Sequence, residues 1–166
     1  MPLVKHGKIT NDALVHLADD AGIPGDGAIL ISAARFLEDA EAVSRRVGRT
    51  GVIWPNNRDV DDLVPYLDRL AVIALVFPTF RDGRAYSQAR LLRSRFRFSG
   101  EVRATGEVLV DMLPLLARTG FDAVALRADH SKEIAERALS FFADGHYQGD
   151  VIEPLPRFRR GGEASA

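Results

Sequence analysis

Arginines are concentrated in one short part of the chain, the segment VFPTFRDGRAYSQARLLRSRFRF from Val76 to Phe98. From Arg81 to Arg103 there are seven arginines and two acids, a local charge of +5 in a chain whose net charge is -1. A guanidinium group is a planar fork that matches the oxygens of phosphate, sulfate, sulfite or a carboxylate. This segment therefore predicts a binding site for a small oxyanion.

The sequence Asp82-Gly83-Arg84 stands between an apolar run and a helical pattern, so it predicts the start of a helix. Asp82 would cap that helix, and Gly83 has the conformational freedom that a tight turn can require. A helix start gathers free N–H groups and partial positive charge, which favours an anion. Arg103, late in a following strand, would face the same spot. We expect the ligand to be bound by Asp82, Gly83, Arg84, Ser87 and Arg103.

Structural roles compete with this interpretation. Four further arginines lie mostly off the apolar stripe of the predicted helix: Arg90, Arg93, Arg95 and Arg97. A solvated helix face accounts for them without any ligand. Asp82 and Arg84 can equally form a cap or an internal ion pair. Glu101 and Arg103 share one face of a strand by period-two alternation, so a buried ion pair explains them as well as a site does.

Candidates for proton transfer are few. Glu101 is one, and His130 is the other, because it follows Asp129 on a strand-to-helix loop at the predicted ligand side. The four histidines show no spacing typical of a metal site, and the chain has no cysteine, so we expect neither a metal nor thiol chemistry. The glycines at 25–27 precede a strand instead of following one, which is the wrong context for a dinucleotide. The sequence therefore names no cofactor.

Size and composition indicate one globular domain, with 46% hydrophobic and 27% charged residues in a chain of 166. A net charge of -1 argues against a general nucleic-acid binder or a membrane-surface protein, because both need a broad cationic field. No apolar run reaches the roughly 20 residues that span a bilayer, and the N-terminus lacks the apolar core of a secretory signal. We expect a cytoplasmic protein with no membrane or nucleic-acid partner.

The scaffold of the site follows from apolar runs that alternate with helical patterns. Five runs are typical of strands, at 28–32, 51–55, 71–77, 100–105 and 121–127. Strands joined by single helices imply right-handed crossovers and a mostly parallel sheet. We expect a single α/β domain of about five strand–helix units. It would be an open doubly wound sheet or, second, a partial barrel that a homodimer would complete.

The predicted domain covers residues 28–152. Residues 1–27 would be an N-terminal extension packed on this domain. Residues 153–166 are rich in proline and glycine and basic in character, so we expect a flexible tail there.

The stretch from Phe77 to Ala123 resembles a bacterial family named for its domain of unknown function, number 934. It carries FPxFxDGRxYSxARxLR, followed by GExRAxGxV and RxGFD, a long and specific set of blocks. The resemblance is weaker but compatible from Ala28 to Val76. One departure stands out, because the family pattern has glutamine after the aspartate at 111 and this chain has Met112.

Members of this family are often labelled oxidoreductases, and their genes commonly lie beside sulfite or nitrite reductase genes of assimilatory sulfate reduction. The resemblance thus implies an accessory protein of sulfite reduction, and the residues add a site for a small oxyanion or an anionic cofactor. Two alternatives stay open. One is a module that docks on a sulfite or nitrite reductase through the arginine-rich helix. The other is a small enzyme that acts on a phosphorylated substrate through Glu101 and His130.

Overall fold

The structure is a computed structural model, and it describes residues 3–5, 8–126, 137–138 and 151. In chain order its strands and helices are β1 (Leu3–Lys5), β2 (Lys8–Thr10), β3 (Val15–His16), β4 (Ile29–Ser32), α1 (Ala33–Glu38), α2 (Ala40–Ser44), β5 (Thr50–Trp54), the 3-10 helix η1 (Val60–Arg69), β6 (Val72–Phe77), α3 (Arg84–Ser94), β7 (Glu101–Gly106), the 3-10 helix η2 (Val110–Met112), α4 (Leu113–Thr119) and β8 (Ala123–Ala125).

These strands form one sheet of eight, in the order β2-β1-β8-β7-β6-β5-β4-β3. Neighbouring strands run parallel from β3 to β8, while β1 pairs antiparallel with both β8 and β2. Between β4 and β8, helices carry the chain from the end of each strand to the start of the next. The prediction of a single α/β domain with a mostly parallel sheet is confirmed.

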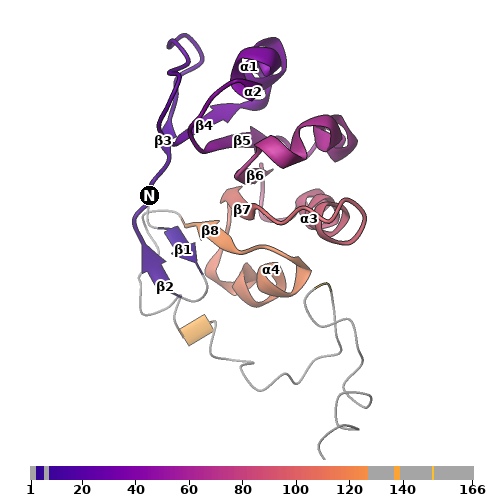
Figure 1. The fold of residues 1–166 in the computed structure, drawn as a ribbon. Helices are drawn as coiled ribbons and strands as arrows, with labels where there is room; N and C mark the ends of the chain where they lie inside the picture. The colour runs from indigo at the N-terminus through magenta and orange to yellow at the C-terminus, as the bar shows by residue number, and fades with distance from the viewer. Residues whose placement is uncertain (1–2, 6–7, 127–136, 139–150, 152–166) are drawn as a thin grey trace, which may run out of the picture.

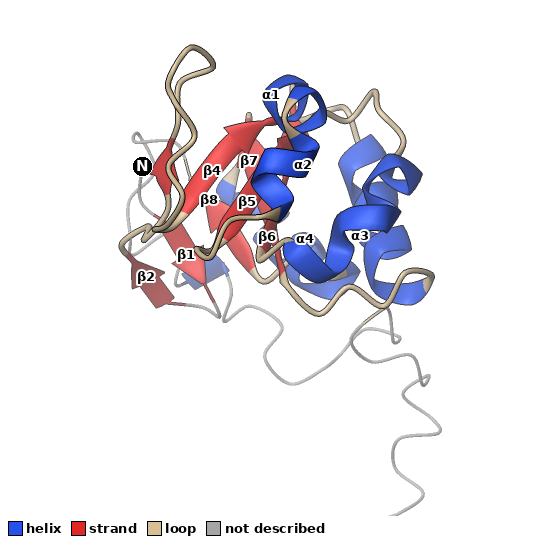
Figure 2. Cartoon of the chain, turned by 45° about the horizontal axis from the view of Figure 1, so that its top comes forward, coloured by secondary structure: helices blue, strands red, loops and turns tan. Residues whose placement is uncertain are grey.

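The helices of this sheet lie on one of its faces, as Figure 1 and Figure 2 show. Their buried side chains form one core cluster with the strand residues that face them, among them Val52, Ile73 and Val102. The other face carries a small cluster that contains no helix residue: Leu14, Leu30, Val72 and Ala74. We call the first the helix face and the second the open face.

Crossovers on a single face give the sheet the form of a half-barrel. A doubly wound sheet has helices on both faces, because its strand order reverses at a switch point. Here β4 to β8 follow one another without a reversal, so the sheet has the second of the two predicted arrangements, the partial barrel. Figure 1 shows the sheet bending away from the helices.

Each of the five predicted strands appears, as β4 to β8, within two residues of its predicted ends. The helical segments between these strands are less regular. The first of them is divided at Asp39 into α1 and α2. The segment around Pro65 forms η1 and not an α-helix, since proline cannot donate the N–H that an α-helix interior requires.

The first residues of the chain are more than an extension packed on the domain. β1 and β2 extend the sheet beyond β8, and β3 extends it beyond β4. Each of these strands has three residues or fewer, too short for periodicity to indicate a strand. The predicted tail, the end of the last predicted strand and His130 lie outside the described residues.

Candidate anion site

The candidate site begins where β6 ends at Phe77 and the loop 78–83 leads into α3. The helix starts at Arg84, with Gly83 as its N-cap residue. Gly83 has φ -82° and ψ 4°, a conformation open to any residue, and an added Cβ would meet only the Tyr86 ring, at 3.6 Å. The predicted helix start is correct, but the turn does not use the conformational freedom of glycine.

Asp82, the residue before the N-cap Gly83, accepts a hydrogen bond from the Arg84 backbone and forms an ion pair with the Arg84 side chain. Its Oδ1 accepts hydrogen bonds from the Arg84 backbone N–H at 3.3 Å and from Arg84 Nε at 3.0 Å, and its Oδ2 accepts one from Arg84 Nη2 at 2.6 Å. The hydrogen bonds from the Arg84 side chain hold the pKa of Asp82 well below its usual range. Of the two structural roles that the sequence left open, the ion pair is therefore present, whereas the N-cap residue is Gly83 and not Asp82. The Arg84 side chain is nevertheless 58% exposed, and its donors to Asp82 are Nε and Nη2, which leaves Nη1 for another acceptor.

Three buried polar atoms at the end of β5, in the turn after it and in α3 lack a hydrogen-bond partner: Trp54 Nε1, Asn56 Nδ2 and Gln88 Oε1. Gln88 Nε2 donates to the carbonyl oxygens of Pro55 at 3.1 Å and Arg58 at 2.8 Å, which fixes the orientation of the amide. Asn56 lies against Asp82 and helps to lower its pKa, although Asn56 Nδ2 is not placed for a hydrogen bond. An unpaired buried polar atom costs about 1–3 kcal/mol. The turn after β5 and the first turns of α3 thus hold unused donors and an unused acceptor.

Sequence reasoning missed these three residues, although Gln88 carried a signal. The buried stripe of α3 contains Ala85, Ala89 and Leu92, and Gln88 takes the i+3 position of that stripe with 6% exposure. A polar side chain inside an apolar stripe must find partners, so its position indicates a special role. Asn56 gave no such signal, because a polar residue after a strand is ordinary.

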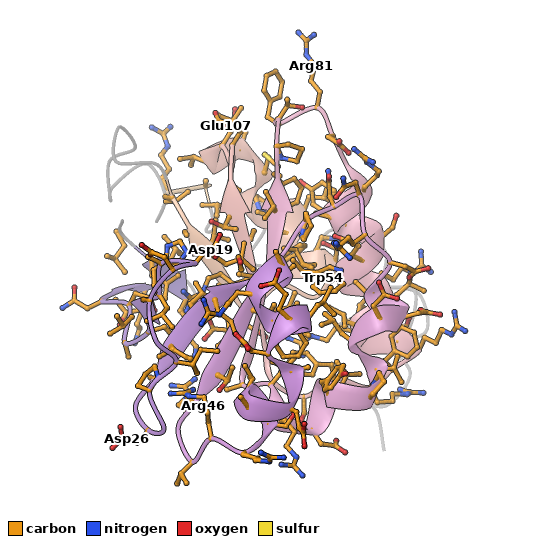
Figure 3. All side chains as sticks on the ribbon, turned by 90° about the horizontal axis from the view of Figure 1, so that it is seen from above. Asp19, Asp26, Arg46, Trp54, Arg81 and Glu107 are labelled. Carbon is orange, nitrogen blue, oxygen red and sulfur yellow. The ribbon has the colours of Figure 1, made fainter. Side chains whose placement is uncertain are left out.

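Two more guanidinium groups stand on aromatic rings at this edge. Arg58 lies over the Trp54 ring, 6.0 Å from its centroid, and Arg81 lies over the Phe80 ring at 5.3 Å. Figure 3 shows Arg81 projecting at the rim of the molecule and Trp54 further inside. Within the turn 54–58 and the loop and helix start 78–84, three arginines stand against one carboxylate. This part of the edge therefore favours an anion.

Arg103 lies elsewhere. It is in the middle of β7, aligned with Ala74 of β6 and Ala123 of β8, and so on the open face. Arg84 belongs to α3, which covers the helix face. Because the sheet separates the two guanidinium groups, the predicted clamp of Arg84 and Arg103 on one ligand is not formed. The prediction failed because β7 begins and ends one residue later than expected, and because alternation turns Arg103 away from the helices.

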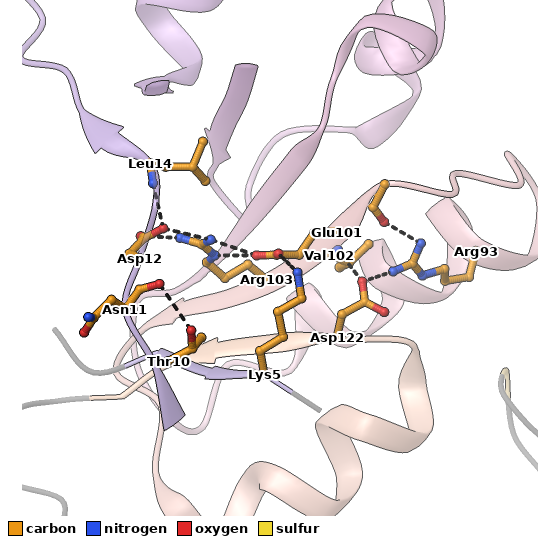
Figure 4. A network of polar contacts seen from close by, with 11 residues as sticks. Lys5, Thr10, Asn11, Asp12, Leu14, Arg93, Glu101, Val102, Arg103 and Asp122 are labelled. Atoms are coloured by element: carbon orange, nitrogen blue, oxygen red, sulfur yellow. Dashed lines mark hydrogen bonds and ion pairs between the residues drawn. The ribbon is translucent and has the colours of Figure 1, made fainter. Parts of the chain in front are cut away.

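Instead, Arg103 is 3% exposed and joins two acids in a network that Figure 4 shows. Arg103 Nε donates to Glu101 Oε1 at 2.9 Å and Nη1 donates to Asp12 Oδ2 at 2.6 Å, while Lys5 Nζ donates to Glu101 Oε2 at 2.7 Å. Burial alone would raise the pKa of Glu101, but the hydrogen bonds from Lys5 and Arg103 outweigh it and lower that pKa. The pKa of Asp12 is lowered in the same way, with Arg103 opposing the effect of burial. This network ties β1 and the segment before β3 to the centre of the sheet.

The arginine-rich helix is not one uniform solvated face. Arg93 joins the α3–β7 loop to the α4–β8 turn through four partners, the carbonyl oxygens of Phe98, Gly100 and Gly120 and the carboxylate of Asp122. Arg90 and Arg95 are exposed, as predicted for a solvated face, and so is Ser87, one turn after the helix start. Of the predicted ligand residues, the structure thus brings Asp82, Gly83 and Arg84 together, with Ser87 on the same helix.

Of the two acid–base candidates, the structure describes Glu101 alone. Both carboxylate oxygens of Glu101 are engaged in ion pairs, and His130 lies outside the described residues. Among the residues that the structure describes, no group of three or more histidines and acids could hold a metal ion. Within the same residues, every helix is too short or too polar to cross a membrane.

The fold and the charges at the carboxyl edge of the sheet define the class of this protein. It is a single-domain α/β half-barrel with a cationic carboxyl edge. The chain belongs to the bacterial family of proteins of unknown function DUF934, whose model matches residues 51–158. The resemblance seen in the sequence blocks is thereby confirmed. No curated protein and no solved structure matches the chain.

Proposed function

We propose that this protein binds a small oxyanion, or the anionic group of a cofactor, at the carboxyl edge of its sheet where α3 begins. The observation that carries the proposal is Asn56 Nδ2, a buried donor that lies beside Asp82 without a hydrogen bond of good geometry, at the start of an eleven-residue helix. An oxyanion would supply the missing acceptor, and Arg84 Nη1 and the helix start would add charge-assisted hydrogen bonds.

Asp82 must release the Arg84 guanidinium before an anion can bind to it. Its ion pair with Arg84 is at the surface, where water and salt screen the attraction, so an incoming anion displaces it at little cost. Arg84 would turn from the carboxylate to the ligand. The ion pair therefore keeps the guanidinium in place without binding it irreversibly.

The biological setting in this proposal is assimilatory sulfite reduction, with the protein as an accessory component. This part is supported by the sequence blocks from Phe77 to Ala123 and by what the family resemblance implies. A strain that lacks the protein should grow poorly on sulfate as its sole sulfur source and normally on cysteine. Equal growth on both would remove the pathway from the proposal.

The binding itself is tested by thermal unfolding with phosphate, sulfite or sulfate at constant ionic strength. A ligand at 100 times its Kd stabilises by about 2.7 kcal/mol, which is easily measured. We expect at least one anion to raise the Tm of the wild type, and we expect Arg84→Ala and Asn56→Ala to lose that response. Arg90→Ala is the matched control, since Arg90 is an exposed arginine of the same helix. The proposal is wrong if no anion raises the Tm, or if Arg84→Ala keeps the full response.

A second candidate function, docking on an acidic surface of a reductase, is supported by the exposure of Arg90 on α3 and of Arg95 directly after it. Arg93 is not available for this role, because it holds the loops around it. The double variant Arg90→Ala/Arg95→Ala should then retain less reductase in a pull-down, while anions should still raise its Tm. Unchanged pull-down would exclude this surface.

A further inference from the structure

A cavity of about 250 Å³ opens at the amino edge of the sheet. Its wall comes from residues 67–70 at the end of η1 and from residues 96–100 between α3 and β7. β6 and β7 start directly after these two segments, so the cavity lies at the opposite edge from Asp82 and Arg84. It is therefore independent of the proposed anion site.

Arg97, on the wall of this cavity, has a backbone conformation that arginine rarely adopts. Its φ is 55°, in the left-handed region, where the chain ends α3 and the Phe98 N–H returns to the Leu92 carbonyl oxygen at 2.9 Å. Glycine is the usual residue at such a helix end, because a Cβ is strained there. The exposed Arg97 side chain makes no ion pair with any described residue, so the fold gains nothing visible from an arginine at this position.

Asp68 is a second charged residue of the cavity wall in a position that its helix disfavours. It lies in the last turn of η1, where the partial negative charge of the helix end repels a carboxylate. Within the described part of the chain Asp68 also has no ion-pair partner. Arg97 and Asp68 thus line one cavity with opposite charges, each in a position that its local backbone disfavours and neither with an ion-pair partner among the described residues.

We infer that this cavity binds a small zwitterion of the α-amino-acid type. Arg97 holds the carboxylate through its planar fork, and Asp68 accepts the ammonium group. The Ser99 hydroxyl on the same wall adds a donor to the carboxylate, and the half-buried Phe96 ring contacts the apolar part of the ligand. A simple anion or a simple cation satisfies only one of the two charges, so the pair selects molecules that carry both.

Titration of the full chain followed by NMR tests this inference, with backbone amides of Ser99 and Gly100 as reporters. The probes are glycine, L-serine, L-methionine and L-phenylalanine, together with N-acetyl-L-methionine and L-methioninamide, which each lack one charge. We expect at least one of the four amino acids to shift these amides with saturation. We expect L-methionine, if it is the binder, to lose its effect when either charge is blocked.

Arg97→Gly is the decisive variant, because glycine suits the left-handed backbone and the fold is kept while the guanidinium is removed. Its affinity for the amino acid should fall at least about tenfold, as should that of Asp68→Asn. Arg95→Ala is the matched control, since Arg95 lies two residues away, pairs with Asp61 at 3.7 Å and does not line the cavity. Its affinity should stay unchanged. The inference is overturned by the absence of binding for all four amino acids, by equal binding of the singly charged analogues, or by unchanged affinity in Arg97→Gly.

Discussion

Replacing Arg103 by methionine should destabilise the protein by about 3 kcal/mol at pH 7. The change keeps an unbranched side chain of similar length on the open face but leaves Glu101, a buried acid, with Lys5 alone, and leaves Asp12 without its cation. Removing one partner of a buried ion pair costs about 3–5 kcal/mol, because the remaining charge stays desolvated. The lower end applies, since the Asp12 side chain is 32% exposed and Lys5 still pairs with Glu101.

The pH dependence of this loss follows from the lowered pKa of Glu101. A carboxyl group whose pKa is lower in the folded state adds stability above its unfolded value of about 4.5, and this contribution disappears as the pH falls through the folded value. Without Arg103, Lys5 alone opposes the effect of burial, so the pKa of Glu101 is higher than in the wild type and protonation relieves part of the strain on the buried charge. The difference between wild type and Arg103→Met should therefore shrink as the pH drops below about 4.5.

Urea unfolding of both proteins between pH 7 and pH 4 measures these differences in the free energy of unfolding. Lys5→Met is the matched control and should lose about 1 kcal/mol, because Lys5 is 35% exposed and Glu101 keeps Arg103. The double variant Glu101→Gln/Arg103→Met should recover part of the loss, since no buried charge is left between them. A loss below about 1 kcal/mol at pH 7, or a loss that does not change with pH, would refute the role assigned to the network.

Three further changes test other parts of the fold. Gly106→Ala should lower the free energy of unfolding in urea by about 2 kcal/mol, because Gly106 has φ 93° and a Cβ would collide with the Phe77 carbonyl oxygen. An unchanged free energy of unfolding would show that the end of β7 relaxes freely. Arg93→Ala should cost about 3 kcal/mol and Arg90→Ala less than about 0.5 kcal/mol, and equal effects would contradict the inward role of Arg93. Arg97→Gly should stabilise by about 0.5–1 kcal/mol in thermal unfolding, and a lower Tm would mean that the left-handed helix end is not strained.

The strands were predictable because their signal is local. A run such as Val72 to Phe77 is buried almost throughout, so it is apolar throughout, and the boundaries follow from the polar residues around it. No single segment of the sequence indicates the face of the sheet on which its helix packs. It depends on the order in which strands pair, and for that reason the half-barrel could be foreseen only as one of two arrangements.

The candidate site was predictable to the same extent. Alternation correctly put Glu101 and Arg103 on one face, and composition correctly put a helix start at Arg84. What decides their roles is pairing across long stretches of chain, such as Arg103 with Asp12, which are 91 residues apart. No periodic pattern reports such a contact. A single sequence therefore suggested the clamp as readily as the buried network.

The antiparallel pairing of Leu3 with Ala125 also determines when the sheet can be finished during synthesis. β1 leaves the ribosome well before its partner β8. Lys5 and Asp12 can meet their ion-pair partners Glu101 and Arg103 only once β7 has been made, while β4 to β7 can already pair with their neighbours in order of arrival. Contacts of such long range form slowly, so we expect the first strand to join last and the nascent chain to carry an unpaired edge until it does.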